Sequence, residues 1–264
     1  MSDLALARAR YVERIAKRER IASKRLLEAL AAVPREDFLP RGPWRIKTEA
    51  ARSYRLTPDA DPVHLYDNVL VAIDARRKLD TGLPSLWAHL IDVLDVREKD
   101  HVVQIGCGLG YFSAVLSKIV GPKGRVQAVD CDERLAYRAA SLLHRYHNVE
   151  VFHGDGWEEI GEPADVIIVH AGFSHPHPLW LQALRPRGRL LVPITQWDRE
   201  GAVVKITRRG RNFEAEAVQQ IRIYPGRGRG TTALDDRVAD WWQRASAVAP
   251  LRFRGIDRGL PADG

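Results

Sequence analysis

The sequence predicts an α/β fold built around a doubly wound, mostly parallel sheet. From residue 100 onward, short apolar runs alternate with helix-patterned segments. A glycine-rich turn joins the first of these runs to the helix that follows it. The 264 residues are 45% hydrophobic and 28% charged, which excludes disordered and collagen-like chains. No apolar run reaches the roughly 18 residues that a membrane span requires, so we expect no membrane association.

The N-terminal region predicts a helical extension ahead of this sheet. Residues 3–32 are rich in Ala, Leu and Arg, which is typical of one or two helices. Ser23 is a candidate N-cap for the second helix, which we place at 24–32 because Pro34 then limits it.

The next region is expected to be a loop followed by a short strand and a helix. Residues 40–65 carry four prolines among polar residues, which indicates a loop excursion. Val69–Ile73 is a short apolar run. Pro84 then opens a helix at 85–94, with its apolar residues on one face.

The alternating region gives the remaining elements. The expected strands are 101–105, 125–130, 149–153, 164–169 and 189–192, and the expected helices are 111–120, 133–146 and 179–184. Two further runs alternate like an antiparallel pair, at 202–208 and 214–224, and a terminal helix is expected at 233–247. We therefore predict a helical and loop segment, a Rossmann-like domain, and a C-terminal helix and tail, at 1–65, 66–224 and 225–264.

The strongest local signal is the glycine turn after the first strand of the alternating region. Gly106, Gly108 and Gly110 let the backbone turn sharply and approach a ligand closely. Asp130 ends the next strand, where a carboxylate can accept hydrogen bonds from ribose hydroxyls. Tyr111 follows Gly110, so the third glycine of a dinucleotide fingerprint is missing. The pattern favours a ligand without phosphates, such as S-adenosylmethionine; the alternative is a turn that only connects strand to helix.

More candidate ligand contacts follow the neighbouring strands. Asp155 is placed to accept from an adenine amino group, or is a simple turn aspartate beside Gly156. Trp157 either stacks near the adenine or belongs to the core. Cys107 and Cys131 lie in ligand-facing turns. We interpret them as small apolar residues beside the cofactor, because neither has a base at recognisable spacing.

Composition limits the remaining site chemistry. The two cysteines lack zinc-site spacing, and His175 and His177 would need further ligands, so we predict no metal site. The net charge of +7 divides into +6 over residues 1–60, −4 over 61–204 and +5 over 205–264. An acidic centre with basic flanks favours an anionic partner that touches the flanks. The basic N-terminus has no apolar core of a signal peptide, so we expect a cytoplasmic protein.

Five segments carry an unusual combination of motifs: ALAAVPREDFLP at 29–40, VQIGCGLGY at 103–111, NVEVFHGDG at 148–156, ADVIIVHAG at 164–172 and LRPRGRLLVP at 184–193. Together they resemble the protein-L-isoaspartate O-methyltransferase family, over roughly residues 8–40 and 64–196. The resemblance implies an S-adenosylmethionine-dependent methyltransferase that contacts its cofactor through Gly106, Gly108, Asp130, Asp155 and Gly156.

The chain departs from the family pattern on the substrate side. Gln104 stands where the family usually has an acidic residue. Gly82 stands where the family's Thr-Ile-Ser-x-Pro segment has the serine that contacts the substrate, with Thr81 and Ser85 as neighbouring hydroxyls. Residues 41–63 resemble an insertion. We therefore expect low activity on simple isoaspartyl peptides unless one of the neighbouring hydroxyls replaces the serine.

A carboxylate is ionised at neutral pH, so methyl transfer to it requires no general base. The protein then has to position the reactants and exclude water. Residues 78–86 are a candidate lid or a plain helix-entry turn, and His170 orients the substrate, acts as a base for a hydroxyl acceptor, or is a packed histidine. The predicted catalytic group is Thr81, Gly82, Ser85 and His170. The predicted cofactor group is Gly106, Cys107, Gly108, Gly110, Tyr111, Asp130, Cys131, Asp155, Gly156 and Trp157.

The sequence thus predicts a methyltransferase acting on an aspartyl or isoaspartyl carboxylate of a protein or peptide. An RNA methyltransferase is a less favoured hypothesis. The basic flanks and Arg227 and Arg229 suit phosphate, but no RNA-binding module is present and the cofactor region is acidic. The same fold also suits a methyltransferase with a small-molecule acceptor, or a protein that binds S-adenosylmethionine without turnover. Gln104 and Gly82 favour binding without turnover.

Overall fold

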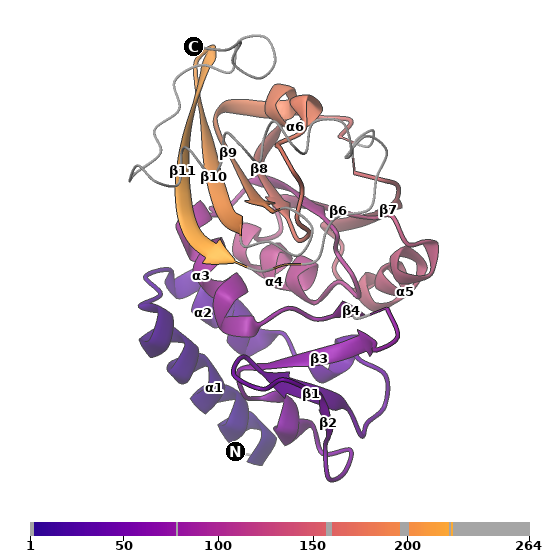
Figure 1. The fold of residues 1–264 in the computed structure, drawn as a ribbon. Helices are drawn as coiled ribbons and strands as arrows, with labels where there is room; N and C mark the ends of the chain where they lie inside the picture. The colour runs from indigo at the N-terminus through magenta and orange to yellow at the C-terminus, as the bar shows by residue number, and fades with distance from the viewer. Residues whose placement is uncertain (1–2, 78, 157–159, 196–200, 222, 224–264) are drawn as a thin grey trace.

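The computed structural model describes residues 3–77, 79–156, 160–195, 201–221 and 223. Two sheets organise this part of the chain (Figure 1). The large sheet has seven strands in the order β11-β10-β9-β8-β5-β6-β7, and the small sheet has four in the order β2-β1-β3-β4. The small sheet and the N-terminal helices lie together below the large sheet in Figure 1.

The large sheet confirms the predicted α/β architecture. Its parallel strands are β5 (His101–Ile105), β6 (Arg125–Asp130), β7 (Val149–His153), β8 (Ala164–Val169) and β9 (Leu184–Ile194). An antiparallel pair closes it, β10 (Gly201–Arg209) and β11 (Asn212–Ile221). The helices between the strands are α4 (Tyr111–Val120), α5 (Glu133–Leu143) and α6 (Pro178–Ala183).

The central strands are apolar throughout because both faces of the sheet are covered. Val102 and Val166 face one core, which they share with helices α2, α3 and α4. Val103 and Ile167 face the other core, which includes the fully buried Trp180 of α6. A strand covered on both faces reads as a continuous apolar run, which is why these strands are recognisable from the sequence.

The helical extension also follows the prediction. It consists of α1 (Asp3–Glu19) and α2 (Lys24–Ala32), and α3 (Pro84–Leu94) lies beside both. Ser23 caps α2, because its Oγ accepts a hydrogen bond from the Leu26 backbone N–H at 3.2 Å. No helix in the described part combines the length and apolar character needed to cross a bilayer.

The loop predicted at 40–65 is wrong in part, because this region contains two strands. They are β1 (Arg45–Thr48) and β2 (Arg55–Leu56), and β1 pairs antiparallel with β3 (Val69–Asp74), which in turn pairs with β4 (Leu79–Asp80). The four prolines lie beside the strands rather than inside them. One short 3-10 turn, Glu36–Phe38, precedes the region and another, Pro62–Leu65, ends it. A small core of its own holds the sheet together, formed by Trp44, Ile46, Leu65, Val69 and Val71.

The division of the chain at residue 65 stays a prediction, although the β1–β3 pairing joins residues on both sides of that boundary. The terminal helix at 233–247 and the tail at 225–264 lie outside the described residues.

Candidate active site

The predicted glycine turn lies at the carboxyl end of β5 and needs glycine for two different reasons. Gly106, Gly108 and Gly110 all have positive φ, at 79°, 58° and 88°. A methyl group on Gly108 would meet only Cδ1 of Ile73, at 3.9 Å, so the backbone here is open to a ligand. At Gly110 a Cβ would lie 2.6 Å from Cδ1 of Leu143, so glycine there lets the turn pack against α5.

Asp130, at the end of β6, holds this turn in place. Its Oδ2 accepts from the Gly108 N–H at 2.8 Å, and its Oδ1 accepts from the Asp132 N–H at 2.9 Å. The side chain is only 7% exposed, and burial raises the pKa of its carboxyl. A carboxylate has about four acceptor positions, so two bonds leave capacity for a pair of hydroxyls. The residue therefore both shapes the turn and offers acceptors beside it.

A third turn reaches the same edge of the sheet after β7. The register pairs Ile105 with Val129 and Asp130 with His153, so the three strand ends lie side by side. Asp155 and Gly156 form this turn. Gly156 has φ 67°, and a Cβ there would lie 2.6 Å from Cγ2 of Ile105. Its carbonyl accepts from the buried indole of Trp180 at 2.7 Å. Trp157 lies outside the described residues.

Three more predicted contacts occupy different positions around the turn. Cys107 is buried, and burial followed by the charge of Asp130 raises the pKa of its thiol well above the usual value. Such a thiol is unsuited to nucleophilic chemistry, consistent with a packing role. Cys131 is exposed. Tyr111 packs edge-on against Phe38, with ring centroids 5.9 Å apart, so its ring faces the N-terminal segment.

The turn predicted as a lid is built around an indole. Gly82 has φ 73°, and a Cβ on it would lie 2.3 Å from Nε1 of Trp87. The Trp87 ring stacks on His170, with centroids 3.7 Å apart and planes 15° apart. His170 in turn adjoins the glycine turn, since a Cβ on Gly106 would lie 3.6 Å from its Cβ. An aromatic stack therefore connects the candidate lid to the candidate cofactor turn.

His170 is neutral at physiological pH. Burial lowers its pKa to about 3. Its backbone N–H donates to the Ile105 carbonyl at 2.8 Å, which fixes the residue at the end of β8. Its Nε2 is buried and has no hydrogen-bond partner within the described ranges. The imidazole thus holds an uncharged Nε2 atom, buried and without a hydrogen-bond partner among the described residues, beside the stack.

The two hydroxyls considered as replacements for a serine at position 82 take part in the fold. Thr81 Oγ1 accepts from the Val71 N–H at 3.1 Å and donates to the Gly82 carbonyl at 3.3 Å. Ser85 is 1% exposed, and its Oγ accepts from Asn68 Nδ2 at 3.0 Å. A substrate role for either hydroxyl stays a prediction. Thr81 would have to give up the bond that it donates to Gly82, and the Ser85 side chain would have to become accessible.

Two positioning residues could not be predicted from the sequence. The guanidinium of Arg35 is 3% exposed and donates to the backbone carbonyls of Leu65, Asp67 and Val69, which anchors the start of β3. Arg35 lies within the N-terminal motif at 29–40, so the sequence marks the segment, but it does not reveal that the side chain binds backbone carbonyls. Trp87 carries no comparable signal, because a tryptophan on the apolar face of a helix is an ordinary core residue.

Comparison with known proteins places this geometry in a family. The model of the family described as protein-L-isoaspartate(D-aspartate) O-methyltransferase matches residues 8–229. The chain belongs to this family. The match confirms the resemblance. It includes most of the helical extension and the whole of the β10–β11 pair, so both belong to the part of the chain shared with the isoaspartate methyltransferase family.

Individual relatives and solved structures agree. A protein-L-isoaspartate O-methyltransferase 2 of Archaeoglobus fulgidus is 36% identical over 72% of this chain and 80% of its own length. A protein-L-isoaspartate O-methyltransferase of a Roseiflexus species is 30% identical over 84% of this chain and 93% of its own length. A solved protein-L-isoaspartate O-methyltransferase has a TM-score of 0.72 at 24% identity, covering 87% of this chain and 68% of its own. A solved structure from Plasmodium falciparum, a putative enzyme of this type in complex with S-adenosyl-L-homocysteine, has a TM-score of 0.66 at 15% identity. It covers 83% of this chain and 98% of its own.

The neutral His170 should make the fold sensitive to acid. Its pKa of about 3 lies below the ordinary value of about 6.5, so between these values only the unfolded chain binds the proton. The free energy of unfolding should therefore fall as the pH drops from about 6.5, by up to about 1.4 kcal/mol per pH unit from this group. Urea unfolding of the wild type and of His170→Phe, which keeps a ring on Trp87, measures the difference.

The variant His144→Asn, which removes an exposed histidine, serves as a matched control. Equal pH dependence in the wild type and His170→Phe would show that the imidazole accepts its proton in the folded state.

Proposed function

We propose that this protein transfers a methyl group from S-adenosylmethionine to the side-chain carboxylate of an isoaspartyl residue in a polypeptide. The observation that carries the proposal is the buried Asp130 carboxylate bonded to the open backbone of Gly108, in a chain that belongs to the isoaspartate methyltransferase family. A nucleoside has ribose hydroxyls that donate hydrogen bonds, and buried carboxylate oxygens can accept them. Glycines beside these oxygens let the backbone come close to the nucleoside.

The residues of the three turns fit this cofactor. Asp130 would accept from the ribose hydroxyls, and Asp155 would accept from the adenine amino group. Gly106, Gly108 and Gly156 would let the backbone approach. When bound, the cofactor supplies an activated methyl group on a positively charged sulfur. The chain's own task is to bring a carboxylate oxygen in line with that methyl and to keep water away.

His170 suits the orientation of an ionised acceptor better than the activation of a hydroxyl. A base with a pKa of about 3 removes a proton from a hydroxyl poorly at neutral pH. A carboxylate is already ionised, so it needs no base, only a hydrogen-bond donor to hold it. A neutral imidazole can donate one hydrogen bond, from whichever ring nitrogen carries the proton. This favours a carboxylate acceptor over the hydroxyl of an RNA or a small alcohol.

Transfer of a tritiated methyl group tests the proposal directly. The purified protein is incubated with labelled S-adenosylmethionine and, in parallel, an isoaspartyl peptide, the isomeric aspartyl peptide and a mixed RNA. The expected result is label on the isoaspartyl peptide that mild base releases, as a methyl ester requires. Base-stable label, label on RNA alone, or cofactor binding without transfer to any acceptor would overturn it.

A further inference from the structure

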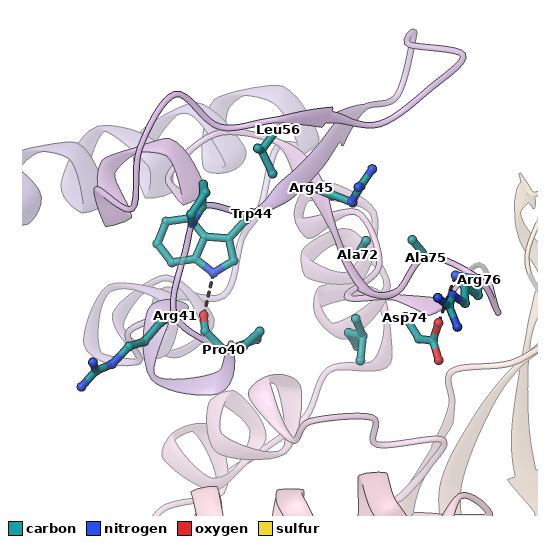
Figure 2. A pocket seen from close by; sticks show the side chains of 11 residues that line it. Pro40, Arg41, Trp44, Arg45, Leu56, Ala72, Asp74, Ala75 and Arg76 are labelled. Carbon is teal, nitrogen blue, oxygen red and sulfur yellow. Dashed lines mark hydrogen bonds between the residues drawn. The ribbon is translucent and has the colours of Figure 1, made fainter.

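An open cleft beside the candidate site takes most of one wall from residues 41–63, the segment that resembles an insertion. Its volume is about 760 Å³. One wall comes from Pro40 to Arg45 and Leu56, and the opposite wall comes from the end of β3 and its turn, Ala72 to Arg76 (Figure 2). Strands β1 and β2 give the first wall its shape, because they pair with each other and β1 also pairs with β3, which carries the opposite wall.

The cleft carries uncompensated positive charge. Arg41, Arg45 and Arg76 line it and are exposed, and within the described ranges none of them forms an ion pair with a carboxylate. Among the described residues of the lining, Asp74 is the one with an acidic side chain. Its Oδ1 already accepts from the backbone N–H groups of Arg76 and Arg77, at 3.0 and 3.2 Å. With respect to the part of the chain that the structure describes, three guanidinium groups are therefore available to an anionic partner.

Three contacts connect the cleft to the candidate active site. Ile73 lines the cleft, and its Cδ1 faces the open side of Gly108. Arg77, in the turn after β3, forms an ion pair with Asp132, two residues beyond Asp130. Segment 41–63 also touches the candidate lid. The hydroxyl of Tyr54 donates to Asp80 Oδ2 at 2.7 Å, while Asp80 Oδ1 accepts from the Gly82 N–H at 2.9 Å. A chain bound in the cleft would therefore lie beside the glycine turn and the candidate lid.

We infer that this cleft binds an acidic stretch of the polypeptide substrate, next to the residue that is methylated. The inference rests on the proposed function and names the substrate class that this chain would favour among isoaspartyl polypeptides. Guanidinium groups recognise side-chain carboxylates through two parallel hydrogen bonds. Leu56, which is 56% exposed, adds an apolar contact of the kind a peptide side chain fills.

The same charges fit a polypeptide better than single-stranded RNA. Proteins that bind unpaired nucleotides stack the bases on exposed aromatic rings. Trp44 is the one aromatic residue that the described part of the chain contributes to the lining, and it is only 5% exposed. Its Nε1 donates to the Pro40 carbonyl at 2.8 Å, which holds the ring against the wall (Figure 2). The cleft therefore offers charge and apolar contact without a stacking platform.

The test uses three isoaspartyl peptides of equal length whose flanking residues are acidic, neutral or basic. For the wild-type protein the KM for the acidic peptide should be about 3- to 30-fold below that for the neutral one, as expected for a few solvent-exposed ion pairs. Raising the salt concentration should shrink the difference. In Arg41→Gln/Arg45→Gln/Arg76→Gln the KM ratio of acidic to neutral peptide should approach one.

A matched control removes the same charge elsewhere. Lys123→Gln/Arg138→Gln/Arg211→Gln changes three exposed cations outside the cleft and should keep the wild-type KM ratio. Arg41→Glu/Arg45→Glu/Arg76→Glu should instead prefer the basic peptide, a gain that a misfolded protein cannot show.

The outcomes separate this inference from the proposed function. If no isoaspartyl peptide is methylated, the proposed function fails. If all three are methylated with the same KM, or if the control triple variant loses the preference as fully as the cleft variant, the acidic-substrate inference fails while the function stands. An RNA oligomer is added as a competitor in a further assay. If the RNA inhibits methylation of the acidic peptide by the wild type and by the control variant but not by the cleft variant, the cleft binds nucleic acid and the inference is overturned.

Discussion

Replacing Asp130 with alanine should weaken the binding of S-adenosylhomocysteine by about 1–3 kcal/mol, or roughly 5- to 150-fold. Two losses add here. The ribose would lose a charged acceptor, and the Gly108 N–H, now bonded to Asp130 Oδ2 at 2.8 Å, would lose the partner that shapes the turn. Isothermal titration calorimetry of the wild type and the variant measures the change. Asp130→Asn, which keeps one acceptor oxygen, should fall between them.

The pH dependence of binding provides a second observation on the same residue. Burial raises the pKa of the Asp130 carboxyl, so the carboxylate takes up a proton at a higher pH than an ordinary aspartate, whose pKa is about 3.9. Cofactor affinity should therefore decline on acidification, and Asp130→Asn should remove that part of the decline. An affinity that Asp130→Ala leaves unchanged would place the ribose away from β6.

Restoring a serine at position 82 should destabilise the protein rather than repair a substrate contact. Gly82 has φ 73°, a conformation that costs an L-residue about 1–2 kcal/mol. A Cβ would also lie 2.3 Å from Nε1 of Trp87, and overpacking of this kind costs about 1–3 kcal/mol. Gly82→Ser should thus lower the free energy of unfolding by roughly 2–5 kcal/mol, measured by urea denaturation.

A double-mutant cycle identifies the indole as the cause. Trp87→Val alone should be destabilising, because Trp87 is 3% exposed and packs against Phe112 and His170. The double variant Gly82→Ser/Trp87→Val should be more stable than the sum of the two single effects, since the smaller side chain makes room for the serine. Simple additivity would mean that Trp87 moves aside without cost and that the strain lies in the backbone alone.

Elements with repeating apolar patterns could be predicted from the sequence. The β5–α4–β6 unit, the cap at Ser23 and the closing antiparallel pair follow from periodicity and turn chemistry, which are local. Strands β1 and β2 could not be predicted in this way. They are only four and two residues long and lie among prolines. They owe their conformation to pairing, of β1 with β3 and of β2 with β1.

The candidate site divides along the same line. Gly106 and Gly108 lie in a turn, and Asp130 at a strand end, that the sequence pattern marks. The hydrogen bond from the Gly108 N–H to Asp130 follows from the parallel register of the two strands. The contact between Gly82 and Trp87, and the stack of Trp87 on His170, join residues that no local pattern connects. The departure at Gly82 is visible as an isolated substitution, whereas its steric partner becomes evident only in three dimensions.

Locating the methyl group on the acceptor tests the central claim most directly. An isoaspartyl peptide and its aspartyl isomer are incubated separately with the protein and S-adenosylmethionine, and both are analysed by fragmentation mass spectrometry. The proposed function predicts a gain of one methyl group at the isoaspartyl residue, lost on mild base treatment, and no gain in the isomer. Equal methylation of both peptides, or methylation at another side chain, would contradict it.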